Sequence, residues 1–398
     1  MHYLNPIRRY WLFVLFYLPA LSSAQLTITG KVENMTTTKP VAYASVFLSN
    51  STIGNQTDTS GNFTLYNVKP GKYDLVVSII GYETYQQTIL VGSTNLQLPP
   101  INILSTAIPL NVVRIKPDNK WFRLYQDFKA DFLGTSEYAK QCKIMDPDSL
   151  DLDYDPNARQ LTARSRGFLV IENKALGYRV KYLLERFVRD YRGKSLSYKG
   201  YTIFEDLAGT PAEKLVWAKN RLDCYLGSSM HFFRSVIKGQ LDTDYNKMNP
   251  TGFQVYKVVR RLNPGYHESG NFADGYSNAD FKYNMRFTDT VLNRTDFYQE
   301  TNIKGIYAIV YPFSLYIIYK DKLDFGRAPI YKDYGMANWQ TSLADLSQPY
   351  ALFDSNGVLV DPTSLTYMGY WATCRVAELL PVDYETPQDK QEAPQSKK

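Results

Sequence analysis

Apolar and polar residues alternate in short runs from residue 26 to about residue 116, and this period of two is typical of half-buried β-strands. The runs include LTITGKVE, ASVFL, NFTLY, KYDLVVSI and YETYQQTILV, with turn residues between them. No helical periodicity interrupts the series. The spacing predicts about seven strands in an all-β sandwich. The core face of one strand carries Tyr73, Leu75, Val77 and Ile79.

The turn residues between these runs have structural roles. Asp58 and Gly61 begin and end the four-residue stretch DTSG, where a short carboxylate can accept backbone N–H bonds and glycine can take a positive φ. The pair Pro70-Gly71 predicts a second turn. A cation ligand is the alternative role for Asp58, and the turn cap is the favoured interpretation.

The pattern becomes helical near residue 117, where Pro117-Asp118-Asn119 follows the apolar run IPLNVVRI. Trp121, Phe128 and Phe132 recur at helical spacing, and Gly134 is placed to end that helix. A second helix is predicted from Thr210, because this residue is an N-cap type that is followed by proline and then by Glu213. The residues Gly227-Ser228-Ser229 are expected to divide it.

Strand-like alternation returns over residues 160–204, where three runs predict an antiparallel meander, and again beyond residue 252. These patterns together predict an α+β region over residues 117–383, with an extended antiparallel sheet and two or three helices. Residues 384–398 are polar, and we expect them to form a disordered tail.

The N-terminus has the features of a secretory signal. Arg8 and Arg9 precede an apolar run from Trp11 to Leu21, and small residues end at Ala24. The run is short for a membrane span, and no later segment offers about 18 uninterrupted apolar residues. We therefore expect cleavage after Ala24, export, and no transmembrane helix in the mature chain. No cysteine follows the cleavage site, so a lipoprotein anchor is not supported.

Composition limits the classes of protein further. The 398 residues exceed one usual hydrophobic core and suggest two or three domains. Hydrophobic residues (44%) and charged residues (21%) are in globular proportion, which excludes a disordered chain and a helical membrane bundle. The net charge of +6 includes the signal, and charges of both signs alternate, so a solvated surface is favoured over a nucleic-acid face. The 33 tyrosines favour strands, with a surface for extended ligands as the alternative.

The first region resembles a known family in residues spread along the whole sandwich. They are Gly30, Pro40, Ala44, Val46, Thr57-Asp58, Gly61, Phe63, Pro70-Gly71, Tyr73 and Gly81-Tyr82. This set is similar to the carboxypeptidase-like regulatory domain, also called peptidase-associated. The resemblance implies a transthyretin-like fold and a role as a folding partner or as a binding and docking module. The region after it resembles uncharacterised C-terminal parts of exported proteins from Gram-negative envelopes.

The sequence lacks the motifs of a metal-dependent or nucleophilic hydrolase. A zinc carboxypeptidase needs two imidazoles and a carboxylate at the metal, yet only His231 and His267 follow the signal, and neither lies in a zinc motif. There is no nucleophile elbow, phosphate-binding loop or dinucleotide fingerprint. Cys224 lies in a predicted helix, where a buried thiol is favoured over a nucleophile. Cys142, Cys224 and Cys374 are too few and too separated for a disulfide scaffold, although one pair could close.

Two charged rows are the remaining candidate sites. Asp151, Asp153 and Asp155 share one face of a predicted strand and could supply oxygen ligands to Ca²⁺, but Pro156 and Thr162 occupy the glycine and glutamate positions of an EF-hand. A solvated edge strand is favoured, with Leu150, Leu152 and Tyr154 facing inward. A basic row could attract an anionic glycan or lipid head group, and a solvated face is again favoured. The basic residues are Arg164, Arg166, Arg179 and Lys181.

We conclude that the sequence predicts a signal peptide (residues 1–24), a sandwich (25–116), an α+β domain (117–383) and a tail (384–398). The predicted function is non-catalytic binding or assembly at the cell envelope, in the periplasm, at the outer membrane or secreted. The predicted partner is an envelope protein, peptide or glycan, with no nucleic acid, metal, cofactor or catalytic residue. One alternative is a hydrolase of unfamiliar type in the α+β region. The other is a small outer-membrane barrel, since IPLNVVRI is similar to the segment that joins such domains to TonB-dependent receptors, although the predicted helices argue against a barrel.

Overall fold

The computed structural model describes residues 26–106, 119–241, 251–262, 264, 283–312, 314–324 and 338–392. The predicted signal peptide, the predicted boundary near residue 117 and His267 lie outside these ranges. So do residues 393–398 of the predicted tail.

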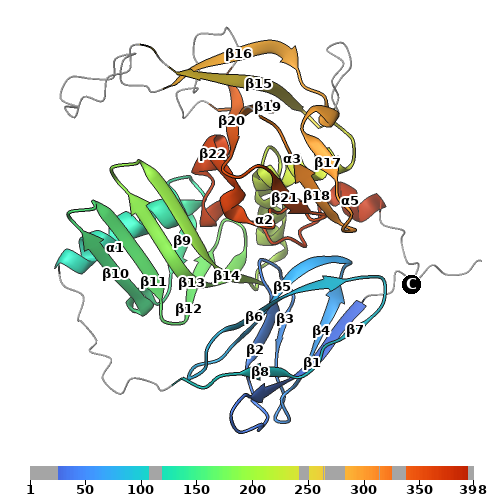
Figure 1. Cartoon of the computed structure of the whole chain (residues 1–398). Coiled ribbons are helices and arrows are strands. Elements are labelled where there is room, and N and C mark those ends of the chain that lie inside the picture. The colour runs from blue at the N-terminus through green and yellow to red at the C-terminus, as the bar shows by residue number, and fades with distance from the viewer. Residues whose placement is uncertain are drawn as a thin grey trace, which may run out of the picture.

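The first region is an all-β sandwich of two sheets (Figure 1). Its strands are β1 (Leu26–Asn34), β2 (Ser45–Leu48), β3 (Gly54–Gln56), β4 (Asn62–Val68), β5 (Gly71–Ser78), β6 (Tyr85–Val91), β7 (Leu96–Gln97) and β8 (Ile101–Ile103). One sheet has the order β4-β1-β7 with β8 also paired to β1, and the other has the order β3-β2-β5-β6. The predicted sandwich is confirmed, with eight strands in place of about seven.

The sandwich core and its turns follow the sequence pattern. Tyr73, Leu75 and Val77 are buried together between the sheets, and Ile79 packs against them as a partly buried residue. The Asp58 carboxylate accepts hydrogen bonds from the backbone N–H groups of Ser60 and Asn62, both at 2.8 Å. Asp58 is therefore a turn cap, and the N–H of Asn62 is the largest influence that lowers its pKa.

A second layer of the protein is a six-stranded antiparallel sheet, seen on the left in Figure 1. Its strands are β9 (Cys142–Ile144), β10 (Leu150–Asp155), β11 (Gln160–Ser165), β12 (Phe168–Asn173), β13 (Tyr178–Asp190) and β14 (Ser195–Asp206). The long strand β13 pairs with β11 and β12 on one side and with β14 on the other. The first strand of the predicted meander is thus divided in two, because the pairing stops around Arg166 and Gly167.

Helix α1 (Asn119–Leu133) covers one face of this sheet. Phe128 and Phe132 are fully buried, and the Phe128 ring meets Phe187 of β13 edge-on, with 4.9 Å between ring centroids. Gly134 follows the helix with a φ of 94°. Phe128 and Phe132 of the predicted aromatic stripe are therefore core, whereas Trp121 is half-buried.

The predicted helix start at Thr210 and the predicted division after residue 226 are both confirmed. Helix α2 (Pro211–Tyr225) has Thr210 as its N-cap in a capping box with Glu213. Helix α3 (Ser229–Ile237) begins after Ser228, whose hydroxyl accepts from the N–H of His231.

The remaining strands form a five-stranded and a three-stranded sheet, in the upper part of Figure 1. The first contains β15 (Phe253–Leu262), β16 (Tyr283–Val291), β19 (Ser314–Leu323), β20 (Trp339–Leu346) and β22 (Leu365–Gly369), in the order β16-β15-β19-β20-β22. The second contains β17 (Tyr298–Glu300), β18 (Ile306–Ile309) and β21 (Ala351–Asp354). Phe232 and Phe233 of α3 pack into the core that these sheets share. The predicted α+β region thus has three antiparallel sheets, and three of its five described helices are long.

The short helices are α4 (Tyr370–Thr373) and α5 (Pro387–Glu392). Helix α5 and the residues before it lie where a disordered tail is predicted, and for residues 384–392 that prediction is wrong. Thr386 and Asp389 exchange hydrogen bonds as a helix cap, and the Tyr384 ring lies 5.6 Å from the ring of Tyr225. This segment is therefore anchored to the rest of the protein although its composition is polar.

Candidate functional site

The sandwich packs against the six-stranded sheet through the outer face of its β3-β2-β5-β6 sheet. Phe47 of β2 and Val76 of β5 are directly opposite each other in the sandwich, and both are buried although they point away from its core. They pack with Tyr201 and Ile203 of β14 in a separate apolar cluster. A Cβ atom on Gly54 would lie 2.2 Å from Cδ1 of Ile203, so a side chain at Gly54 would displace Ile203.

The turn between β2 and β3 inserts into the edge of β14. The N–H of Asn50 donates to the carbonyl of Thr202 at 2.6 Å, and the N–H of Phe204 donates to the carbonyl of Ser51 at 2.9 Å. Ser51 is completely buried. Strand-like hydrogen bonds therefore join the two regions in addition to apolar packing.

Residues 381–389, which we call the terminal strap, also contact the sandwich at this junction. The N–H of Val382 donates to the carbonyl of Asn50 at 2.7 Å, and the side chain of Val382 is part of the sandwich core. The N–H of Thr52 donates to Asp383 at 2.9 Å, and Lys69 of the β4–β5 turn forms an ion pair with Glu385. The strap thus contacts two separate turns of the sandwich.

Arg234 of α3 binds the strap through hydrogen bonds from its guanidinium. Its guanidinium donates to three main-chain carbonyls: Asn356 at 2.8 Å, Tyr384 at 2.9 Å and Val382 at 2.8 Å. A planar guanidinium with five N–H donors suits such a fork, which an ammonium cannot reproduce. Arg234 therefore joins α3, the turn after β21 and the strap.

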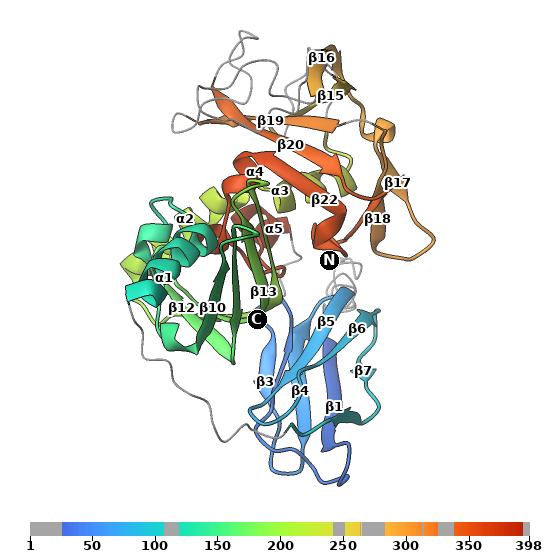
Figure 2. The same cartoon turned by 60° about the vertical axis from the view of Figure 1, so that its left-hand side comes forward.

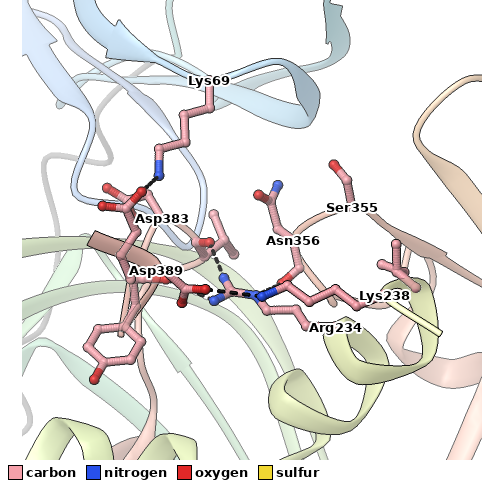
Figure 3. Close-up of a pocket in the computed structure, with 11 residues that line it drawn as sticks. Lys69, Arg234, Lys238, Ser355, Asn356, Asp383 and Asp389 are labelled. Atoms are coloured by element: carbon pink, nitrogen blue, oxygen red, sulfur yellow. Dashed lines mark hydrogen bonds and ion pairs between the residues drawn. The ribbon is translucent and has the colours of Figure 1, made fainter. Parts of the chain in front are cut away.

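These segments line a pocket of about 250 Å³ (Figure 3). It is lined by Lys69, Arg234, Ile237, Lys238, Ser355, Asn356, Val382, Asp383, Tyr384, Glu385 and Asp389. Three cations and three carboxylates converge here, and Figure 3 shows the ion pairs between them. Nζ of Lys238 lies 3.1 Å from Oδ1 of Asp389. Burial raises the pKa of Asp389, but hydrogen bonds from Thr386 and Lys238 outweigh it, so the pKa is below its ordinary value.

The hydrogen bonds and ion pairs of the three carboxylates limit the chemistry that this pocket can perform. Asp383, Glu385 and Asp389 each accept a hydrogen bond or an ion pair from a neighbour within the junction. A general acid needs a raised pKa and a free path to substrate, and Asp389 has a lowered pKa. The arrangement therefore stabilises the junction, and binding of a small polar molecule would have to compete with these pairs.

Only one of the two histidines that follow the predicted signal, His231, lies within the described structure. His231 lies on α3, where its Nδ1 accepts from the N–H of Gly227 at 3.2 Å and its ring packs on Phe253 and Tyr319. Burial lowers the pKa of His231 to about 4, and nearby Lys238, Lys322 and Arg234 act in the same direction. His267 lies outside the described residues. In the described part of the chain, no three His, Cys, Asp or Glu residues are grouped as metal ligands.

The cysteines occupy interior or half-buried positions. Cys224 of α2 is buried as predicted, and burial raises the pKa of its thiol. Burial and then Glu378 raise the pKa of Cys142 to about 12. Thiolate chemistry at neutral pH is disfavoured at both positions. All three cysteines lie in described segments, and no disulfide joins them.

Both charged rows are paired within the protein. Asp151 lies on the edge strand β10, 3.3 Å from both Arg164 and Arg166. Asp153 is an exposed residue of the same strand, and Asp155 caps the following turn through the N–H groups of Asn157 and Ala158. Arg179 pairs with Glu172, and Lys181 pairs with Glu205. The favoured prediction of solvated faces agrees with these contacts.

Sequence reasoning missed the junction, although part of its signal is present. The letters VFL in β2 and LVV in β5 are consecutive apolar residues, which indicate strands buried on both faces. One such face is the sandwich core and the other is the junction with Tyr201 and Ile203. Arg234 and the strap carry no such signal, because each depends on contacts between residues more than 120 positions apart.

The comparisons with known proteins concern mainly the sandwich. Residues 28–115 match the CarboxypepD_reg-like domain family, which confirms the predicted resemblance for this region and marks it as a non-catalytic β-sandwich module. The match covers less than half of the chain. No curated protein sequence is significantly similar to the chain. The resemblance of the second region to exported envelope proteins stays a prediction.

Several solved structures have partial similarity to the chain. One is a type II cohesin–X-dockerin complex from Acetivibrio cellulolyticus, with 22% identity, 22% of this chain and 63% of that chain covered, and a TM-score of 0.19. Another is a group B streptococcus pilus 2b backbone protein, with 18% identity, coverage of 20% and 41%, and a TM-score of 0.18. A protein of unknown function from Bacteroides fragilis NCTC 9343 has 16% identity, coverage of 40% and 65%, and a TM-score of 0.16. The chain spans less than two thirds of each of these proteins, and the TM-scores are too low to support an argument about fold or function.

Among the helices described here, none has the length and apolar character needed to cross a membrane.

Proposed function

We propose that the protein is an exported, non-catalytic binding or assembly protein of the cell envelope, with the sandwich as a docking module fixed to the second region. In this proposal residues 1–24 are a cleaved signal, and the mature protein resides in the periplasm, at the outer membrane or outside the cell. Its partner is an envelope protein, a peptide or a glycan.

One observation carries the non-catalytic part of this proposal. The charged groups that converge at the junction pocket are engaged in holding α3, the sandwich turns and the terminal strap together, with Arg234 at the centre. The match of residues 28–115 to a non-catalytic domain family agrees with this interpretation. A sandwich fixed in this way presents its free loops at a constant angle, which lowers the entropy cost of binding.

The test of location and partner uses the full chain with its own N-terminus. The intact mass should correspond to cleavage after Ala24, and cell fractionation should place the protein outside the cytoplasm. The purified chain, immobilised, should retain a defined envelope component, and Ile80→Asp at an 88% exposed loop position should test whether the far end of the sandwich contributes. An uncleaved protein in the cytoplasm would contradict the proposal.

A hydrolase is the second candidate, because the junction pocket brings three carboxylates beside three cations. The matched test compares the wild-type chain with Asp383→Asn and Glu385→Gln on ester, peptide and glycan substrates. Turnover that both variants abolish, in proteins with unchanged thermal stability, would favour the hydrolase over the binding protein.

A further inference from the structure

The terminal strap has two parts that are held in different ways. Pro381 and Val382 are buried, and Val382 is part of the sandwich core. Residues 383–389, which we call the latch, contain three half-buried carboxylates, and these make the charged contacts of the strap. In both Figure 1 and Figure 2, helix α5, at the end of the latch, lies beside α3 on the side nearer the sandwich. The latch therefore bridges the sandwich and α3.

The contacts between the latch and the sandwich are accessible to solvent. Glu385 forms an ion pair with Lys69, and these two side chains are 36% and 48% exposed. The Asp383 carboxylate accepts from the N–H and from the hydroxyl of Thr52, which is an exposed residue of the turn between β2 and β3. Water and dissolved ions can therefore compete directly for both contacts.

The contacts between the latch and the second region combine one ion pair with one main-chain contact. Nζ of Lys238 lies 3.1 Å from Oδ1 of Asp389, and these side chains are 48% and 26% exposed. Arg234 donates to the carbonyl of Tyr384 at 2.9 Å, and the Tyr384 ring lies 5.6 Å from the ring of Tyr225. Beyond Tyr384, the latch is attached to other elements through the ion pairs of Glu385 and Asp389.

These ion pairs make the attachment of the latch sensitive to salt. The electrostatic screening length is about 30 Å at 0.01 M ionic strength and about 3 Å at 1 M. The shorter length is close to the 3.1 Å between the charged atoms of Lys238 and Asp389. Burial of Pro381 and Val382 involves no charge, so screening does not weaken it. Salt should therefore act on one part of the strap and leave the other part in place.

We propose that the latch is a salt-dependent device that controls access to the junction pocket: it detaches from Lys69 and Lys238 as the ionic strength rises, while Val382 stays in the sandwich core. The latch supplies four of the eleven residues that line the pocket, so its release opens one wall. The apolar cluster of Phe47 and Tyr201 keeps the sandwich attached to the second region. The inference does not depend on the proposed location or on the proposed envelope partner.

Hydrogen exchange of the full chain, followed by mass spectrometry, tests the proposal without any ligand, because local opening exposes backbone N–H groups to exchange. Between about 0.01 M and about 1 M NaCl, the N–H groups of the latch should exchange about three to ten times faster. The N–H of Val382, which donates to the carbonyl of Asn50, and the N–H groups of β13 should change by less than about twofold. Unchanged exchange in the latch, or equal acceleration of the latch and Val382, overturns the proposal.

Charge reversal tests the ion pair itself. Lys69→Glu places a like charge beside Glu385 and should accelerate exchange in the latch at low salt by at least about threefold. The double variant Lys69→Glu with Glu385→Lys restores an opposite pair and should return the rate to within about twofold of the wild-type rate. Lys140→Glu is the matched control, because it makes the same change in the exposed pair with Glu137 and should leave the latch unaffected.

Recovery in the double variant distinguishes an ion pair from a purely structural role of Lys69. Unchanged exchange in Lys69→Glu, or a latch that still exchanges rapidly in the double variant, overturns the proposal. If Lys69→Glu does not fold, the salt series of the wild-type chain decides.

Discussion

Nη2 of Arg234 donates to the carbonyl oxygen of Val382 at 2.8 Å, and Val382 is at the same time a member of the sandwich core. One guanidinium on α3 thus holds a residue that belongs to a different hydrophobic core. The two cores are coupled through this contact.

Arg234→Ala should lower the free energy of unfolding by about 3 kcal/mol, because three main-chain carbonyls lose a charged donor. Arg234→Lys should recover only part of the loss, because an ammonium cannot reach all three carbonyls. Urea unfolding followed by tryptophan fluorescence measures both values. Arg164→Ala, at an exposed ion pair, is the control and should change stability by less than about 1 kcal/mol. Equal effects of the two alanine variants would contradict the assigned role of Arg234.

Ile203→Asp should separate the sandwich from the second region without altering the sandwich core. The substitution places a charge against Phe47 and Val76, which burial makes unfavourable. Calorimetry should then resolve two transitions, whereas the wild-type chain should unfold in one cooperative transition. Ile80→Asp changes a side chain that is 88% exposed and should leave a single transition. A single transition at unchanged temperature for Ile203→Asp would show that the junction contributes little.

His231 should make stability depend on pH between about 6.5 and about 4. Its folded pKa is about 4 and its ordinary value is 6.5, so the unfolded state binds more protons in this window. Stability is therefore full above about pH 6.5 and falls as the pH decreases toward 4, by up to about 3 kcal/mol. His231→Asn keeps an acceptor for the N–H of Gly227 without titrating, and it should flatten the profile in this window. Unfolding midpoints measured from pH 4.5 to 7 check the slope, and an unchanged slope in the variant would refute this origin.

The three cysteines should differ in reactivity in the native protein. Cys142 and Cys224 are buried and their thiol pKa values are raised, whereas Cys374 is half-buried. A disulfide reagent at pH 8 should therefore modify Cys374 first, and the other two should react at least about tenfold more slowly until the protein unfolds. Peptide mapping after timed labelling identifies the modified residue. Rapid modification of Cys224 would contradict its placement.

The parts of the fold that were predicted are those set by local chemistry. Thr210, Pro211 and Glu213 specify a helix start through contacts within four residues, and the structure has that capping box. Asp58 caps its turn through the next four residues for the same reason. The alternation in KYDLVVSI places Tyr73, Leu75 and Val77 in the core because a strand has a period of two.

The parts that were missed depend on contacts over long sequence separations. Val76 points away from the sandwich core, and packing against Tyr201 of β14 buries it. The polar segment from Tyr384 to Asp389 has the composition of a flexible tail, yet Arg234 and Lys238 of α3 and its C-cap bind it, and so does Lys69 of the β4–β5 turn. The composition of a segment indicates whether it would be ordered in isolation. It does not indicate which distant residues of the folded chain will bind the segment.

The strap has a consequence for the order of folding. Residues 381–389 contact turns that are synthesised more than 300 positions earlier, such as those at Thr52 and Lys69. The sandwich can pack against β14 once residues 201–204 have been made, but its contacts with the strap must wait until nearly the whole polypeptide has been synthesised. A chain that ends before the strap would lack Val382 in the sandwich core and the contacts at Thr52 and Lys69, and cellular proteases would have a means of recognising it as incomplete.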